Sequence, residues 1–141
     1  MERNEDQGPS RGVTPHLGIR GGRAAEAIDF YKRAFGAEEV TRMPAEDGKR
    51  LMHSHLKLNG DSLMLADDFP EYTGREAGAP EGVTLHLQVD DADAWFNRAV
   101  ESGASVTMPL EDQFWGDRYG QVQDPFGHRW SIGAPAVLKQ D

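Results

Sequence analysis

The pattern of hydrophobic and polar positions changes its period early in the chain. Over 16–20 apolar and polar residues alternate, which predicts a strand with Leu17 and Ile19 on one face. Over 24–35 the apolar positions recur at helical spacing, and Gly36 follows where a left-handed cap is favoured. Three further strands are predicted to complete this first unit, at 38–43, 51–58 and 62–66.

The same order of elements recurs after residue 82. Alternation over 83–89 is followed by a helical stripe that ends at Gly103, 67 residues after Gly36 (103 − 36). The hairpin glycines Gly60 and Gly127 have the same offset (127 − 60). The second set of three strands is predicted at 104–108, 119–123 and 128–132.

This internal repeat predicts an α+β fold of two tandem βαβββ units. One such unit cannot cover both faces of its sheet, so we expect a curved mixed sheet that forms a trough, with the helices on the outer face. The predicted segments are a disordered tail at 1–12, a first unit at 13–67, a linker at 68–82, a second unit at 83–133 and a C-terminal tail at 134–141.

The side chains that should line the trough follow from the alternation along each strand. If the leucines and valines meet the helices, four of the five histidines and Gln121 face the other way. Histidine can bind a metal, move a proton or hydrogen-bond a ligand, although a single histidine is more commonly an ordinary polar residue on a sheet. The histidines on this face are His16, His53, His55 and His86.

A loop before the last hairpin adds two candidate residues at the mouth of the trough. Trp115 could stack on a planar ligand, and Arg118 could pair with an anionic one. Alternatively, Trp115 plugs one end of the trough and Arg118 holds the loop to Asp117 or Glu111. The predicted ligand-binding set is therefore His16, His53, His55, His86, Trp115, Arg118 and Gln121.

Composition removes several classes of function. The net charge of −9 argues against binding to nucleic acid and to anionic membrane surfaces. The absence of cysteine excludes disulfides and thiolate chemistry, and no apolar run has the length of a membrane span. The first ten residues are too polar for a signal peptide, so we expect a cytoplasmic protein.

Three segments resemble one protein family. TPHLGIRGGRAAEAIDFYKRAFGAEEV at 14–40, HSHLKLNGDSLMLADD at 53–68 and the string WGDR-x-G…DPFGH-x-W within 113–133 resemble the vicinal-oxygen-chelate superfamily. This group is also called the glyoxalase/bleomycin-resistance/dioxygenase superfamily, and the likeness is strongest to its PhnB-like branch. That branch often carries a demethylubiquinone-methyltransferase label, but no glycine-rich cofactor loop follows a strand here.

The resemblance also implies where a metal site would be. Metal-dependent members take one ligand from the first strand and one from the last strand of each half. Carried over to this chain, those positions are His16, Met64, Thr84 and Ser131, of which only the histidine is a usual ligand. We therefore expect no metal cofactor. The alternative is a divalent ion on a displaced His16–His86 pair, helped by His53 or His55.

Two functions remain open on this basis. One is a binding protein that holds a small aromatic or amphipathic molecule in the trough. The other is a metal-dependent isomerase, lyase or dioxygenase of the vicinal-oxygen-chelate type. In either case, members that resemble this chain commonly pair, which together with open sheet edges predicts a homodimer.

Overall fold

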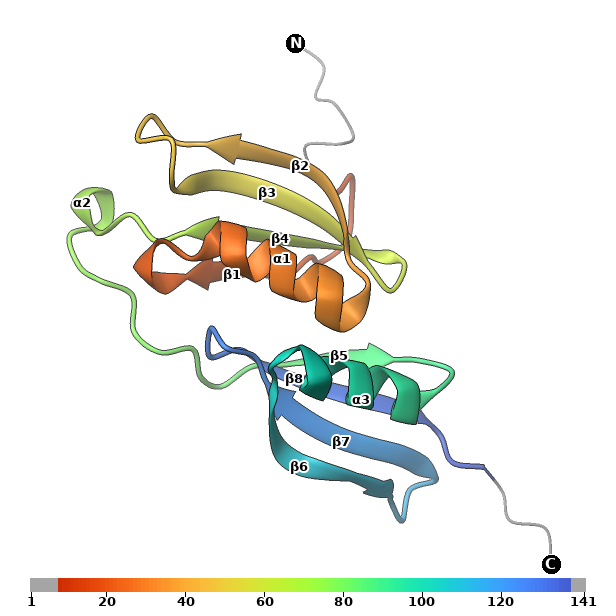
Figure 1. Cartoon of the computed structure of the whole chain (residues 1–141). Helices are drawn as coiled ribbons and strands as arrows, with labels where there is room; N and C mark the ends of the chain where they lie inside the picture. Colours follow the sequence, from red (N-terminus) through yellow and green to blue (C-terminus); the bar gives the residue numbers. More distant parts are fainter. Residues whose placement is uncertain (1–7, 138–141) are drawn as a thin grey trace, which may run out of the picture. The chain divides into compact units, whose positions relative to one another are not determined.

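The computed structural model describes residues 8–137. The chain divides between Gly78 and Ala79, within the predicted linker, into two compact units. The first is unit 1 and the second is unit 2 (Figure 1). Part of each predicted tail, residues 1–7 and 138–141, lies outside the described residues.

Unit 1 contains one four-stranded mixed sheet in the order β1-β4-β3-β2. The β1–β4 pair is parallel, and the other two pairs are antiparallel. A 3₁₀ turn, Arg20–Gly22, joins β1 to α1. The strands and helices are β1 His16–Ile19, α1 Ala24–Phe35, β2 Glu38–Pro44, β3 Leu51–Leu58, β4 Asp61–Asp67 and the short α2 Pro70–Thr73.

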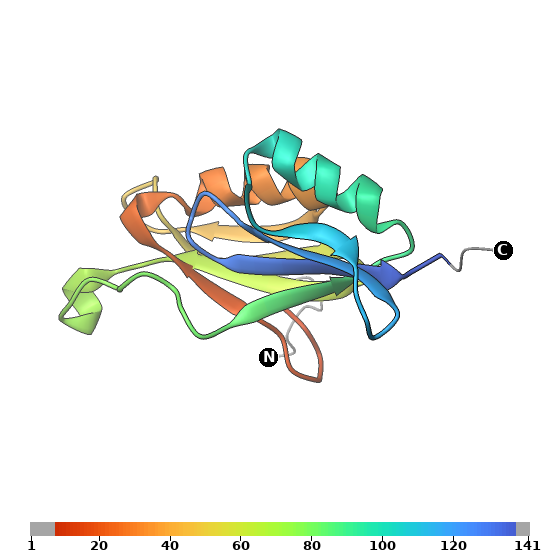
Figure 2. The same cartoon turned by 90° about the horizontal axis from the view of Figure 1, so that it is seen from below.

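Unit 2 repeats this arrangement in the order β5-β8-β7-β6, again with one parallel pair, β5–β8. Figure 2 shows α1 and α3 each lying against one face of its own sheet. The α+β class and the two βαβββ units predicted from the sequence are confirmed. The elements are β5 Thr84–Gln88, α3 Ala92–Ser102, β6 Ser105–Asp112, β7 Asp117–Gln123 and β8 Arg129–Pro135.

Helix α1 forms where its apolar stripe predicted it. Gly36 ends the helix with φ of 68°, a left-handed conformation that costs glycine little, and its N–H returns to a carbonyl of the last turn. Tyr31 and Phe35 stack with ring centroids 6.2 Å apart. The predicted stripe is entirely buried, and it consists of Ala24, Ala27, Ile28, Tyr31 and Phe35.

Helix α3 follows its prediction only in part. The side chain of Asp91 caps the first turn by accepting a hydrogen bond from the Ala94 N–H, at 3.1 Å. The apolar stripe predicts five buried residues, namely Ala92, Trp95, Phe96, Ala99 and Val100. Trp95 is only half-buried and Val100 is exposed, whereas the other three are buried. The buried face of α3 is therefore narrower than the apolar pattern indicated.

The predicted ends of two strands were wrong. Strand β6 continues past Met108, because an irregularity in its register with β7 accommodates Pro109, which cannot donate to the ladder. Strand β8 runs to Pro135, so regular structure extends into the predicted C-terminal tail. Helix α2 lies in the predicted linker, where Pro70 begins the turn and Gly74 closes it with φ of 87°.

Among residues 8–137, no helix combines the length and apolar composition needed to cross a membrane.

Glu39 joins α1 to β2, and this contact predicts a loss of stability in acid. Its carboxylate accepts hydrogen bonds from Arg42 at 2.6 Å and from Lys32 at 2.8 Å. The Arg42 hydrogen bond, opposed by burial and helped by Lys32, lowers the pKa of Glu39 to about 2. Because the pKa of Glu39 is lower in the folded state, its ionised carboxylate stabilises the fold. This stabilisation is complete above the unfolded pKa of about 4.3 and is lost as the pH falls towards 2.

We expect Glu39→Gln to lower the free energy of unfolding by about 1–2 kcal/mol at neutral pH, after allowance for solvent screening of the partly exposed partners. Urea unfolding should show this difference shrinking to near zero by about pH 2. The matched control is Glu38→Gln, the same change at an exposed neighbouring position. A difference between Glu39→Gln and the unsubstituted protein that stays constant across this pH range would contradict the assignment.

Candidate functional site

In unit 1, the predicted histidines share one face of the sheet. The register pairs His16 and His55 with Met64 from opposite sides, so both lie in one row across β1, β4 and β3. His53 occupies the same face one pleat away. His16 is exposed, His53 is half-buried and His55 is buried.

His55 is part of a small polar cluster between β3 and β4. Its Nε2 lies 2.8 Å from the Ser62 hydroxyl, which also accepts a hydrogen bond from the Lys57 ammonium at 3.1 Å. His55 is thus a buried histidine with a hydrogen-bond partner inside the sheet. This arrangement fits the structural interpretation of His55 better than direct contact with a ligand.

In unit 2, His86 is held by hydrogen bonds at both ring nitrogens. Nδ1 lies 2.7 Å from the Ser131 hydroxyl, and Nε2 lies 2.8 Å from Gln88 Oε1. Ser131 pairs in register with His86 on one side and with Gln121 on the other, so all three side chains lie on one face. Ser131 and Gln88 thus hold the imidazole from its two nitrogens.

Gly133 makes room for the imidazole of His86. A Cβ atom at this position would lie 3.0 Å from His86 Cε1 and 3.5 Å from Gln88 Oε1. Without that atom, the imidazole extends over the next row of the sheet. There it stacks on the ring of Tyr119, with centroids 5.8 Å apart and an interplanar angle of 21°.

Tyr119 connects His86 to the loop before β7. The ring of Trp115 meets Tyr119 edge to face with centroids 5.7 Å apart, and Phe114 meets Trp115 in the same way at 5.0 Å. Gln121 donates to the Tyr119 hydroxyl at 3.0 Å. Phe114 is 97% exposed and Trp115 is 49% exposed, which is unusual for such large apolar rings. We call Phe114, Trp115, Tyr119 and His86 the aromatic face.

The loop that carries Trp115 is a tight turn. Gln113 donates its backbone N–H to the carbonyl of Asp117 at 2.7 Å, and Gly116 donates to the carbonyl of Gln113 at 3.1 Å. The indole N–H of Trp115 donates to Asp117 Oδ2 at 3.0 Å. The ring therefore has a fixed orientation while about half of its surface remains accessible.

Arg118 does not join Trp115 at the aromatic face. It alternates with Tyr119 along β7 and so points to the side of the sheet that α3 covers. Its guanidinium forms two hydrogen bonds to Asp93, at the start of α3, and one to Asp112. The hydrogen bonding from Arg118 lowers the pKa of Asp93. Arg118 therefore links β7 to α3 and β6 through Asp93 and Asp112. The sequence had suggested Asp117 or Glu111 as its partner.

The structure separates the predicted set by unit. It places His16, His53 and His55 on one face of unit 1, and His86, Gln121 and Trp115 on one side of unit 2. That all of them line a single cavity stays a prediction. Tyr119 is missing from the predicted set, although it lies two residues before Gln121 in β7 and therefore shares its face of the sheet.

The register of the parallel pairs changes one of the four metal-ligand positions inferred from the resemblance. Met64 and Ser131 are equivalent in the repeat, being 67 residues apart (131 − 64). Met64 pairs with His16 and Ser131 pairs with His86, whereas Thr84 pairs with Arg129. The position equivalent to His16 is therefore His86, and the prediction of Thr84 was wrong.

The corrected set of His16, Met64, His86 and Ser131 offers two imidazoles, a thioether and a hydroxyl. Zinc and iron sites in proteins need more anionic or imidazole ligands than this, so the residues do not fit the superfamily's metal site. Within 8–137, no group of three or more His, Cys, Asp or Glu side chains is arranged to hold a metal ion.

Comparison with known proteins agrees with this architecture. The chain is 51% identical over 128 residues to the uncharacterised protein Mb0911c of Mycobacterium bovis, a match covering 87% of this chain and 82% of that protein. It is 31% identical to the uncharacterised Arabidopsis thaliana protein At5g48480, covering 84% of this chain and 76% of that one. Among solved structures, TioX from Micromonospora sp. ML1 matches with a TM-score of 0.68 and 28% identity, covering 89% of this chain and 100% of TioX.

The family signature spans most of the described residues. The sequence profile named Glyoxalase/Bleomycin resistance protein/Dioxygenase superfamily matches residues 14–132, which reach from β1 into β8 and include the aromatic face. The chain therefore belongs to the glyoxalase/bleomycin resistance protein/dioxygenase superfamily.

Proposed function

We propose that this protein binds a small planar aromatic molecule on the aromatic face of unit 2, without a metal ion. The main support is a continuous series of ring contacts that runs from Phe114 through Trp115 and Tyr119 to His86. Small-molecule sites combine aromatic side chains with a few convergent polar groups, and both are present here. The bound molecule would extend this series by one further ring.

Polar groups beside the rings would orient such a ligand. The Gln121 amide and the Tyr119 hydroxyl already form one hydrogen-bonded pair, and the His86 imidazole and Gln88 amide form another. The Gln121 amide keeps further donor and acceptor capacity, which can reach a hydroxyl or carbonyl on the ligand. The rings would supply most of the affinity, and the amides would select the substituents.

The second candidate is a metal-dependent isomerase, lyase or dioxygenase. One observation favours it, because the register places His16 and His86 at equivalent positions in the two units. Met64 and Ser131 count against it, since neither supplies the ionic ligand that completes such a site. We therefore place this candidate below the binding protein. Homodimerisation also stays a prediction from the sequence.

Trp115→Ala is expected to weaken binding of the neutral planar probe 2-naphthol about fivefold, because one stacking contact is worth about 1 kcal/mol. Isothermal titration calorimetry of the intact protein measures this directly. The control is Tyr72→Ala, which removes an exposed aromatic ring from unit 1 and should leave the dissociation constant unchanged. Equal affinities for the Trp115→Ala and unsubstituted proteins would refute the site.

A further inference from the structure

A separate cavity lies in unit 1, where the loop between β2 and β3 meets α2. Its volume is about 450 Å³, which is within the range of small-molecule sites. The proposed function involves none of the residues that line it. The lining includes Glu46, Asp47, Arg50, Met52, Phe69 and Tyr72.

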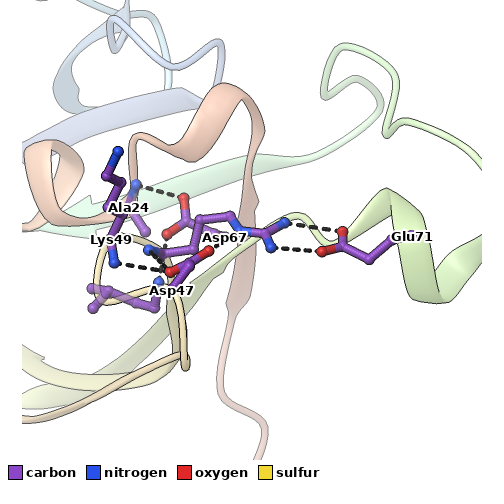
Figure 3. Close-up of polar contacts among 7 residues, drawn as sticks. Ala24, Asp47, Lys49, Asp67 and Glu71 are labelled. Atoms are coloured by element: carbon purple, nitrogen blue, oxygen red, sulfur yellow. Dashed lines mark hydrogen bonds and ion pairs between the residues drawn. The ribbon is translucent and has the colours of Figure 1, made fainter.

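Arg50 builds one wall of this cavity. Its guanidinium pairs with both carboxylate oxygens of Glu71 on α2, at 2.9 and 2.6 Å, and its Nε donates to Asp47 at 2.7 Å. The guanidinium carbon also lies 4.3 Å from the centre of the Phe69 ring. Figure 3 shows Asp47 and Glu71 with the contacts that connect the loop to α2. Arg50 thus holds the two sides of the cavity together.

The charge around the cavity is negative. Asp47 and Glu71 carry two negative charges against the one positive charge of Arg50. Hydrogen bonds from Arg50 lower the pKa of both acids, that of Asp47 to about 2. Glu46 adds a further carboxylate, and no side chain within 8–137 bonds to it. An anionic ligand would have to displace Glu71 and then approach Glu46, whereas a cation would meet Glu46 directly.

The apolar part of the cavity is unusually exposed. Tyr72 is 83% exposed and Met52 is 63% exposed. The register between β2 and β3 shifts between the pairs Met43–His53 and Pro44–Leu51, and this β-bulge leaves Met52 outside the pairing. The rings of Phe69 and Tyr72 lie 6.1 Å apart. Aromatic faces next to carboxylates attract ammonium groups, because the ring face carries partial negative charge.

We propose that this cavity is a second binding site, specific for a small organic cation with an apolar body. Its ammonium group lies near Glu46, and its body packs against Tyr72 and Met52. The site is independent of the aromatic face, which belongs to unit 2.

The test compares two probes with the same aromatic body and opposite charges, phenethylammonium and 3-phenylpropionate. Amide chemical shifts of the intact protein report where each probe binds. We expect phenethylammonium to shift signals of residues 45–52 and 69–73 and 3-phenylpropionate to leave them unchanged. Glu46→Gln and Tyr72→Ala should each raise the dissociation constant of phenethylammonium about fivefold.

Two control variants show whether binding of the cation is specific to this cavity. Glu38→Gln removes the same charge from an exposed position on β2, and Trp115→Ala alters the aromatic face; both should bind phenethylammonium as the unsubstituted protein does. Equal binding of the two probes, or an affinity that Glu46→Gln leaves unchanged, would overturn the proposal. Because 2-naphthol reports on unit 2, either site can fail without the other.

Discussion

Replacing Asp124 with alanine is expected to lower the free energy of unfolding by about 4 kcal/mol. The buried carboxylate accepts three hydrogen bonds within the β7–β8 hairpin. The backbone N–H groups of Phe126 and His128 donate to Oδ1 at 2.9 and 3.0 Å, and the indole N–H of Trp130 donates to Oδ2 at 2.9 Å. Alanine would leave these donors without their acceptor, and each buried unsatisfied donor costs about 1–3 kcal/mol.

Urea unfolding followed by circular dichroism measures this loss. Asp124→Asn should fall between the alanine variant and the unsubstituted protein, since Oδ1 stays while an amide group faces the indole N–H of Trp130. Asp61→Ala is the matched control, because Asp61 is an exposed acid in the equivalent hairpin of unit 1. A loss of less than about 1 kcal/mol in Asp124→Ala would show that the three bonds do not hold the hairpin.

The second large effect is expected for Asp67→Ala, at about 4 kcal/mol. Asp67 is buried at the end of β4, and its two oxygens accept from different elements. Oδ1 accepts the N–H of Ala24 at 2.8 Å, at the start of α1, and Oδ2 accepts the N–H of Leu51 at 2.7 Å, at the start of β3 (Figure 3). The carboxylate also lies at the positive end of the α1 dipole.

Thermal and urea unfolding of Asp67→Ala should be compared with those of Asp68→Ala. Asp68 is the next residue along the chain and accepts one exposed hydrogen bond, from the N–H of Ala77 at 3.0 Å. The Asp68 variant should lose less than about 1 kcal/mol. If the two variants were equally stable, Asp67 would not be the residue that joins α1, β3 and β4.

Local sequence signals were sufficient for much of the fold. The apolar period of α1 and the glycine that ends it depend on neighbouring residues alone, and both agree with the structure. The repeat was visible because Gly36 and Gly103 end equivalent helices. Alternation also assigned His86 and Gln121 to one face correctly.

The remaining features depend on residues that are distant in the chain. The register between β5 and β8 is set by pairing across more than forty residues, as in His86–Ser131. Because no local pattern contains this register, the sequence alone indicates Thr84 instead of His86 as the metal-ligand position. The stacking of His86 on Tyr119 requires the space above Gly133. Likewise, the cavity of unit 1 depends on Arg50 meeting Glu71 across 21 positions. No local pattern encodes these contacts.

The aromatic face is proposed to bind a planar molecule without a metal ion. The most direct measurement is a titration of the purified, untagged protein with 2-naphthol, followed by amide chemical shifts, with and without a chelator. We predict shifts in residues 114–121 and 84–88 and the same affinity in both titrations. Shifts confined to other residues, or binding that disappears with the chelator and returns when zinc is added, would contradict binding of this kind.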